Sequence, residues 1–393
     1  MAPTLIHSEK LLEECDKIPN LLGRLPQKAS MIYRLIEAYG LLKFVNVVEP
    51  RKAQHDEILL YHSENYLKHL KSCDGDEDVT EEDEEFGLSY DCPKFSGLYQ
   101  FAEIIVGGTL SAAETLISGS NFVINWSGGW HHAQSDRADG FCYVNDIVVG
   151  IQKLVSHFPR ILYLDLDVHH GDGVENAFSC TQRVFCLSFH LHEPGFFPGS
   201  GSVNECGFGS GKGYSANFPY KRNLSGRRFR KYFTKTTNLV RERFDPSACV
   251  IQCGADGIAG DPLGGANLTP RDFADCIKQV MSWSIPCLFV GGGGYNLPNA
   301  SRHFATLTAT ICGIDQLHDD IPEHEFFNAY GAGFELSIEP KNLPDSNTDE
   351  DLEETFRSIE ANLDRFNPMA YPTIREVFLD QLSRPYQLDH EES

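Results

Sequence analysis

The sequence predicts an α/β protein built on one central, mostly parallel β-sheet with helices on both faces. Short apolar runs bounded by glycine recur along the chain, and stretches with helical spacing lie between several of them. Strands that are apolar throughout are typical of a parallel sheet that is buried on both faces. With 393 residues, of which 41% are hydrophobic, the chain can bury a large core. We expect a single domain over residues 1–368 and an appended tail over residues 369–393.

The individual elements follow from the spacing of the apolar residues. Helical spacing near the N-terminus is shown by Ile32, Leu35, Ile36 and Tyr39. Two further helices are expected over 101–118 and 272–284. A late helix follows Thr348, a plausible N-cap, and contains Leu352, Phe356, Ile359 and Leu363. The expected strands cover 121–126, 161–168, 183–189, 249–253 and 286–290.

Composition excludes several classes of protein. A formal net charge of −23 argues against nucleic-acid binding, which needs clustered Lys and Arg, and favours cationic partners. No stretch resembles a membrane span or a signal peptide. The twelve cysteines include no Cys-x-x-Cys pair, which favours reduced thiols. We therefore expect a soluble intracellular protein that binds neither nucleic acid nor membranes.

Two charged segments stand out. Nine of the twelve residues from 74 to 85 are acidic, a pattern usually found in a solvated, mobile loop. The basic run 227–231 fits either a weak nuclear targeting signal or the exposed face of a helix, and the helix is the preferred interpretation.

The stretch 161–173 is the most informative part of the chain. An apolar run there ends in three aspartates and two histidines, followed by glycines. Residues two apart in an extended segment point the same way, so Asp165, Asp167 and His169 are expected to share one side. Aspartate and histidine suit zinc or ferrous iron, and a cation offsets the cost of burying neighbouring carboxylates. A polar strand end that caps the next helix is the alternative, although a cap needs only one short polar residue.

Polar clusters follow four of the expected strands. They are 126–132 with the His131–His132 pair, 165–172, 254–256, and the glycine run 291–294 before Tyr295. Groups just beyond the carboxyl ends of parallel strands gather in one crevice. The four segments are therefore expected to form a single site.

Three of these residues have the chemistry of a catalytic metal site. Asp167, His169 and Asp256 supply three ligands and leave positions for water and substrate. Asp256 by itself equally fits an ordinary turn aspartate. For the histidine pair we assign Asp165 to His131 and Asp172 to His132, since an imidazole acts as a base only when its tautomer is held.

Aromatic residues complete the expected site. Tyr295 follows four glycines that allow close backbone approach, and its hydroxyl can stabilise an oxyanion. The glycine run lacks the Lys-Ser/Thr of a phosphate-binding loop. The 194–198 turn adds two phenylalanines and Gly140-Phe141 adds another, which suits the methylenes of a lysine side chain, although ordinary core packing is an equal alternative.

Together these motifs resemble the zinc-dependent class I histone deacetylases. The resemblance runs in order from about residue 25 to 335 and rests on 126–133, 140–146, 165–173, 194–199, 254–256 and 291–296. It implies the arginase/deacetylase-type fold and hydrolysis of N6-acetyl-lysine in acetylated histone tails or other proteins. It also implies a chromatin regulator that represses transcription, present in nucleus and cytoplasm.

The resemblance implies a role for each motif residue. Asp167, His169 and Asp256 would bind zinc, with ferrous iron possible in cells. His132 would be the general base and then the acid, supported by His131, and Tyr295 would donate to the oxyanion. Substrate would contact Asp91 at the rim and the tunnel residues Gly140, Phe141, Phe197 and Leu263. One potassium site would use Asp165, Asp167, His169 and Ser188, and a second the carbonyls of Phe178, Thr181, Val184 and Tyr214.

Some positions depart from the family pattern. Lys28 replaces an arginine of the internal product channel, and Leu263 stands where some members carry methionine. Asp261-Pro262 stands where corepressor-complex members carry an arginine for inositol phosphate, so no such site is expected. A two-metal ureohydrolase, a polyamine deacetylase and a catalytically silent scaffold are the rival interpretations. The first needs more aspartates than are visible, and the last has no need of the full set of site residues.

Overall fold

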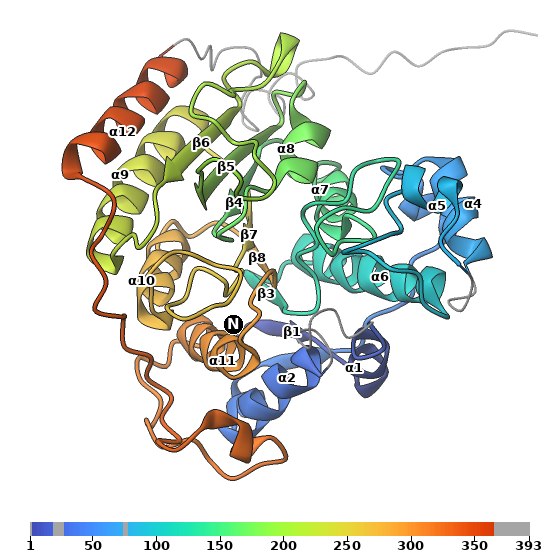
Figure 1. Ribbon diagram of the computed structural model, residues 1–393, viewed down its shortest axis with the longest axis horizontal. Helices are drawn as coiled ribbons and strands as arrows, with labels where there is room; N and C mark the ends of the chain where they lie inside the picture. Colours follow the sequence, from blue (N-terminus) through green and yellow to red (C-terminus); the bar gives the residue numbers. More distant parts are fainter. Residues whose placement is uncertain (1, 19–26, 74–77, 365–393) are drawn as a thin grey trace, which may run out of the picture.

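A single eight-stranded parallel sheet forms the centre of the computed structural model, which describes residues 2–18, 27–73 and 78–364. Figure 1 shows the sheet running through the molecule. Its strand order is β2-β1-β3-β8-β7-β4-β5-β6. Each neighbouring pair of strands is parallel. The strands are β1 (Thr4–Ile6), β2 (Asn46–Val48), β3 (Phe122–Asn125), β4 (Ile161–Asp165), β5 (Val184–Leu191), β6 (Ser215–Tyr220), β7 (Ala248–Gln252) and β8 (Cys287–Val290).

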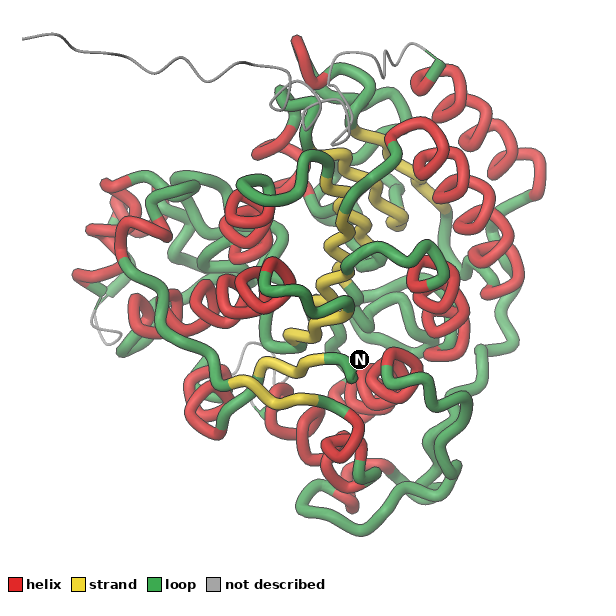
Figure 2. The backbone as a smooth tube through the Cα atoms, turned by 180° about the vertical axis from the view of Figure 1, so that it is seen from behind, coloured by secondary structure: helices red, strands yellow, loops and turns green. Residues whose placement is uncertain are grey.

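Helices cover both faces of this sheet, as the view from behind also shows (Figure 2). One layer contains α6 (Leu98–Ile117), α7 (Asp146–Leu154) and α8 (Asp172–Phe178). The other contains α2 (Lys28–Ala38), α9 (Gly226–Phe244), α10 (Pro270–Met281), α11 (Leu297–Ile311) and α12 (Asp349–Leu363). Shorter helices are α1 (Glu9–Cys15), α3 (His55–Ile58), α4 (Glu64–Ser72) and α5 (Glu81–Glu85).

Alternate side chains of β4 enter the two cores. Ile161 and Tyr163 pack with residues of α6 and α7, whereas Leu162 and Leu164 pack with residues of α9, α10 and α11. All four are at most 2% exposed. Burial on both faces explains why the strand is apolar at every position, and the predicted fold class is confirmed.

All five predicted strands and the predicted helices are present, with ends that differ by a few residues. The helix over 272–284 begins earlier, at Pro270, and Thr348 caps α12 as expected, with its side chain accepting from the Asp351 N–H. The prediction missed β1, β2 and β6. The first two have only three residues, and β6 contains Pro219, which is tolerated because this strand lies at the sheet edge.

The acidic segment departs from the expected mobile loop. Glu81–Glu85 form α5, which Thr80 caps, and Asp83 is only 2% exposed. Residues 74–77 and the tail 369–393 lie outside the described residues. The basic run lies in α9, where Arg228 pairs with Asp345 and Arg230 with Asp272, in agreement with a helix face. Nowhere in the described segments does a helix combine the length and the apolar character needed to span a bilayer.

Candidate active site

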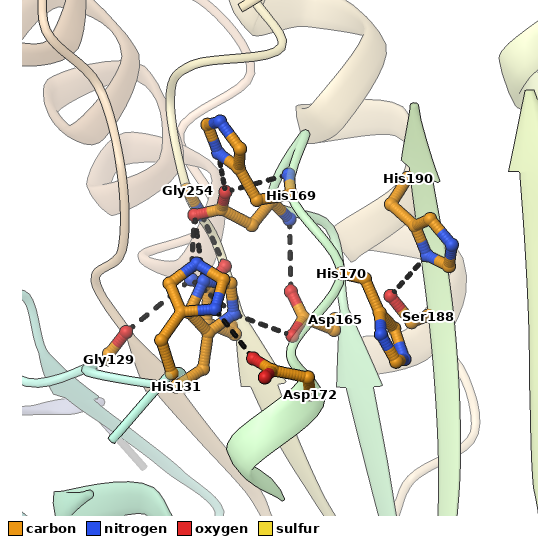
Figure 3. A network of polar contacts seen from close by, with 12 residues as sticks. Gly129, His131, Asp165, His169, His170, Asp172, Ser188, His190 and Gly254 are labelled. Atoms are coloured by element: carbon orange, nitrogen blue, oxygen red, sulfur yellow. Dashed lines mark hydrogen bonds and ion pairs between the residues drawn. The ribbon is translucent and has the colours of Figure 1, made fainter. Parts of the chain in front are cut away.

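The polar segments that follow β3, β4, β7 and β8 meet at the carboxyl edge of the sheet. Figure 3 shows His131, Asp165, His169 and Asp172 projecting into one network, with Gly254 beside them. These strands are adjacent in the order β3-β8-β7-β4, so their ends deliver side chains to the same place. The predicted convergence of four segments is therefore present in the fold.

Asp167, His169 and Asp256 form a compact group of potential metal ligands. One donor atom from each lies within 4.8 Å of the others, and all three residues are buried. His169 Nδ1 lies 3.2 Å from Asp167 Oδ1 and 3.0 Å from Asp256 Oδ2. The strand ends at Asp165, so a loop rather than a continued strand places Asp167 and His169 in the site.

The donor set fits a divalent cation. A single N–H on His169 cannot donate fully to two carboxylates, whereas a cation can bind all three groups. The other carboxylate oxygens are already occupied by protein donors. Asp167 Oδ2 accepts from Gln252 Nε2 and from the Gly293 N–H, both at 2.8 Å, and Asp256 Oδ1 accepts from the Val168 N–H at 2.9 Å. Such outer contacts orient the ligands. The remaining oxygens, Asp167 Oδ1 and Asp256 Oδ2, both face His169 Nδ1.

The two carboxylates also respond to each other. Burial and the charge of Asp167 raise the pKa of Asp256 to about 7. Burial opposes ionisation of Asp167 as well, but the charge of His131 and contacts with His169 hold its pKa well below the usual value. Two buried like charges at this distance are costly without a cation, which again favours a metal at this position.

Two glycines allow the carboxylates to approach this closely. A Cβ on Gly254 would lie 2.1 Å from Asp167 Oδ2, and one on Gly293 would lie 2.0 Å from Asp256 Oδ2. Any side chain at either position would displace a ligand. These two positions therefore require glycine for a steric reason, which the spacing of residues in the sequence does not reveal.

Each histidine of the adjacent pair has its own carboxylate, as expected. His131 Nδ1 lies 2.8 Å from Asp165 Oδ2, and His132 Nδ1 lies 2.8 Å from Asp172 Oδ1. Burial would lower the pKa of His131, but the charges of Asp165 and Asp167 outweigh it and raise the pKa to about 9. Burial and the charge of His131 lower the pKa of His132 to about 4. The two imidazoles thus have different protonation preferences.

Three polar residues support this network and were missed in the sequence. The Tyr163 hydroxyl donates to Asp165 Oδ2 at 2.6 Å, Gln134 Nε2 donates to Asp172 Oδ2 at 3.0 Å, and Gln252 contacts Asp167. Tyr163 lies between two leucines of the buried strand β4, and Gln252 is the last residue of the otherwise apolar strand β7. A polar residue inside an apolar run was therefore the available signal, whereas Gln134 gave none.

Aromatic rings form the walls above the histidines. The Phe197 ring lies 4.9 Å from the His132 ring, the Phe196 ring stacks on His169 at 5.0 Å, and the Phe141 ring lies 5.6 Å from Tyr295. Phe197 is 39% exposed, so this wall reaches the surface. The core-packing alternative thus does not describe Phe197, and Phe196, the other phenylalanine of the 194–198 turn, lies against His169.

The histidine pair also borders a pocket. Its lining includes Lys28, His131, His132, Cys142 and Tyr295. Lys28 Nζ donates to the Gly292 carbonyl at 2.7 Å and lies 5.8 Å from the centre of the Tyr295 ring. Burial lowers the pKa of Lys28, although the nearby aspartates oppose this. Lys28 therefore lines a pocket next to the histidine pair and Tyr295.

The remaining predicted residues lie around this centre. Asp91 is half-buried next to the exposed Tyr90, and burial raises the pKa of Asp91. Leu263 is half-buried, and Asp261 links it to Tyr295 by accepting from both N–H groups, at 2.9 and 2.7 Å. Burial, together with the charges of Asp256 and Asp167, holds the pKa of the Tyr295 phenol well above its usual value.

The residues of the two expected potassium sites lie on and beside β5. Ser188 lies opposite Asp165 on β5, and its Oγ lies 2.8 Å from His190 Nδ1. At the second site, the Phe178 carbonyl accepts from the Thr181 N–H at 3.1 Å and the Tyr214 carbonyl accepts from the Cys186 N–H at 3.0 Å.

Comparison with known proteins agrees with this geometry. Residues 24–311 match the model of the histone deacetylase domain. The chain is 45% identical over 366 residues to histone deacetylase 8 of Xenopus tropicalis, covering 92% of this chain and 98% of the relative. It is 44% identical to histone deacetylase 8 of Danio rerio, covering 91% and 94%. Identity to human histone deacetylase 1 is 38%, over 86% of this chain and 70% of that protein.

Proposed function

Because the chain belongs to the histone deacetylase family and is a zinc-dependent lysine deacetylase, we propose that the site at the carboxyl edge of its sheet carries out the reaction. The enzyme acts on acetylated lysine in proteins such as histones. The reaction hydrolyses the N6-acetyl amide and yields lysine and acetate. One observation carries the proposal, namely that the ligand group of Asp167, His169 and Asp256 lies beside two histidine–carboxylate pairs.

Asp167, His169 and Asp256 are the proposed zinc ligands, and ferrous iron is an alternative metal for the same donors. When bound, the metal polarises the substrate carbonyl and lowers the pKa of a water molecule. Two carboxylates bring the site close to neutral, which favours the release of anionic acetate. Gln252 and the Gly293 N–H hold Asp167 in position for this role.

His132 is the proposed general base and then the general acid. Its Nδ1–H donates to Asp172, which leaves Nε2 to accept a proton from water and later to deliver it to the departing lysine Nζ. His131, held by Asp165, supports His132, because its charge helps to set the pKa of that neighbouring imidazole. For both proton transfers, Asp172 must keep the proton of neutral His132 on Nδ1, so that Nε2 faces the substrate.

Tyr295 is the proposed oxyanion donor. Its phenol stays protonated because burial and the neighbouring aspartates oppose ionisation, so it can donate to the carbonyl oxygen as negative charge develops. Asp261 holds its backbone by accepting from the Tyr295 N–H at 2.7 Å. Glycines before Tyr295 allow the loop to bring it to the ligands.

The substrate side chain is proposed to lie between aromatic rings. Phe141 and Phe197 form the walls for the lysine methylenes, and Phe196 extends these walls. Gly140 lies against His132 and Phe197 and leaves the space between the walls open. Leu263 contacts the substrate near Tyr295, and Asp91 accepts hydrogen bonds from the substrate backbone at the rim. Apolar contact with the methylenes and a polar rim together select an extended acyl-lysine peptide.

Several finer features belong to the same proposal. Potassium is bound near Asp165, Asp167, His169 and Ser188, and by the carbonyls of Phe178, Thr181, Val184 and Tyr214. The enzyme has no inositol-phosphate site and binds neither nucleic acid nor membranes directly, in keeping with its net charge of −23. It acts in nucleus and cytoplasm, with residues 1–368 as the catalytic domain and 369–393 as an appended tail.

Replacing Tyr295 by phenylalanine tests the mechanism. Loss of one oxyanion donor should lower kcat for an acetyl-lysine peptide by roughly 10²-fold or more, while KM changes little. Tyr90→Phe is the matched control, since that tyrosine is 89% exposed and should keep wild-type turnover. Wild-type kcat in Tyr295→Phe would remove this residue from the mechanism.

A further inference from the structure

A second group of metal-binding side chains lies outside the active site, where α4 meets α5. His69 lies in the last turn of α4, Cys73 follows that helix directly, and Asp83 lies in α5. Residues four apart share one face of a helix, so His69 and Cys73 are positioned to act together. Figure 1 shows α4 and α5 next to each other at the edge of the molecule, with α6 between them and the sheet.

The donor atoms of these three residues are close enough for one ion. His69 Nε2 lies 2.8 Å from Asp83 Oδ1, and the imidazole nitrogen, the thiol sulfur and the carboxylate oxygen all lie within 4.8 Å of one another. Zinc ligands at ~2.0–2.3 Å from the metal are separated by roughly 3–4 Å, so small shifts suffice. Asp83 is 2% exposed and Cys73 8%, so the group is built into the interior.

The surroundings of Asp83 resemble the outer contacts of a metal ligand. Its Oδ2 accepts from Lys94 Nζ at 2.8 Å, from the Thr80 N–H at 2.8 Å and from Thr80 Oγ1 at 2.7 Å. Its Oδ1 faces His69. One oxygen is therefore fully occupied and fixes the carboxylate, and the other is directed toward the two remaining donors.

The charges in this region favour a cation despite Lys94. With Cys73 ionised, its thiolate, Asp83 and Glu82 would carry three negative charges against the single positive charge of Lys94. Glu82 Oε1 lies 3.8 Å from His69 Nδ1, on the other side of the ring from Nε2, close enough to orient the imidazole. The other carboxylates of α5 add negative charge close to the site and attract cations.

We propose that His69, Cys73 and Asp83 bind a second divalent metal ion of the zinc class. Water completes the tetrahedral set. The Cys73 thiol, which donates to the His69 carbonyl at 3.3 Å, releases its proton on binding. The ion joins the end of α4 to α5. From α5 the chain continues to the rim residue Asp91, with the Leu88 N–H donating to the Asp83 carbonyl at 2.7 Å.

Cobalt substitution distinguishes this site from the active site. The proposed active-site ligands include no sulfur, so a thiolate-to-cobalt charge-transfer band in the near ultraviolet reports only a cysteine-containing site. We expect this band, and about two metal equivalents per chain, when the full-length protein is loaded with Co²⁺. Asp256→Asn should keep the band although it removes an active-site ligand, so failure of the active-site assignment would be seen separately.

Cys73→Ser supplies the decisive variant, with Cys180→Ser as the matched control at an exposed thiol. The Cys73 variant should lose the band and one metal equivalent while it keeps deacetylase turnover, which also shows that it folds. The Cys180 variant should keep the band, the second metal equivalent and the turnover. A wild-type protein without the band at saturating Co²⁺, or a band that persists in Cys73→Ser, would overturn the proposal.

Discussion

The Nδ1 atom of His132 lies 2.8 Å from Oδ1 of Asp172, while the other oxygen of that carboxylate accepts from Gln134 Nε2 at 3.0 Å. Asp172 is thus held from both sides, and the imidazole can present only Nε2 to the substrate. The arrangement makes the tautomer of His132 depend on one carboxylate, which leads to the first prediction.

Replacing Asp172 by asparagine should lower kcat by roughly 10²-fold or more with little change in KM. The amide can donate to His132 Nδ1 and thereby favour the wrong tautomer, as in hydrolases where such a substitution removes the base function. Steady-state kinetics with an acetyl-lysine peptide measure the effect. Asp136→Asn, at an exposed position on the loop that follows the histidine pair, is the control. A kcat within twofold of wild type would show that Asp172 does not orient the base.

Gly140→Ala should close the tunnel. A Cβ there would lie 2.6 Å from His132 Cδ2 and 2.8 Å from Phe197 Cε1, and the glycine has a φ of +51°. Gly195→Ala carries the same kind of backbone strain at a φ of +82° but meets no atom within 4 Å. We expect kcat/KM to fall by at least tenfold in the first variant and to stay near wild type in the second. Equal losses in both would assign the effect to backbone strain instead.

Metal removal should abolish activity and lower stability in the wild type. Without a cation, Asp167 and Asp256 repel each other in the interior, so chelation should lower Tm and added zinc should restore both Tm and turnover. Free zinc at about 1,000 times its Kd should raise the free energy of unfolding by ~4 kcal/mol. Asp256→Asn should show no zinc-dependent recovery of activity. Calorimetry and activity assays over a zinc titration check this, and full activity of the chelated enzyme would contradict it.

Stability should fall between about pH 6.5 and pH 4 because of His62. Burial lowers its pKa from 6.5 to about 4, and its Nε2 accepts from the Asn145 N–H at 2.9 Å. Above this range both the folded and the unfolded forms are neutral. Between pH 6.5 and pH 4 only the unfolded chain binds the proton, so the free energy of unfolding falls by up to roughly 3 kcal/mol. Below pH 4 both forms are protonated and the loss is constant.

His62→Gln isolates this contribution, since a glutamine oxygen can accept from the same N–H without titrating. Urea unfolding at several pH values should show a smaller decrease for the variant than for the wild type as the pH falls. Parallel curves would indicate that His62 does not contribute to the acid sensitivity. Asn145 also donates to the Ala133 carbonyl at 3.0 Å, so the acid effect should reach the loop that carries the histidine pair.

Much of the site was predictable because its chemistry is concentrated in short motifs. The Asp165–Gly173 motif, the His131–His132 pair and Tyr295 each follow an apolar run, and the parallel-sheet rule alone brings such groups to one edge. The same motifs predicted the family. Tyr163 and Gln252 were missed although each is a polar residue in an apolar run, because their role depends on which carboxylate lies beside them in the folded sheet.

The order of short apolar runs and the residue types at their ends determined the fold class, the family and the proposed set of reacting groups, since burial on both faces and ligand chemistry leave direct traces in the sequence. Only the tertiary structure decided the distances between groups far apart in the chain. Gly140, Gly254 and Gly293 matter because of what lies within 3 Å of them, and Asp83 became a buried anchor of α5 through Lys94 and His69. Such contacts join segments by through-space packing, which local spacing along the chain does not encode.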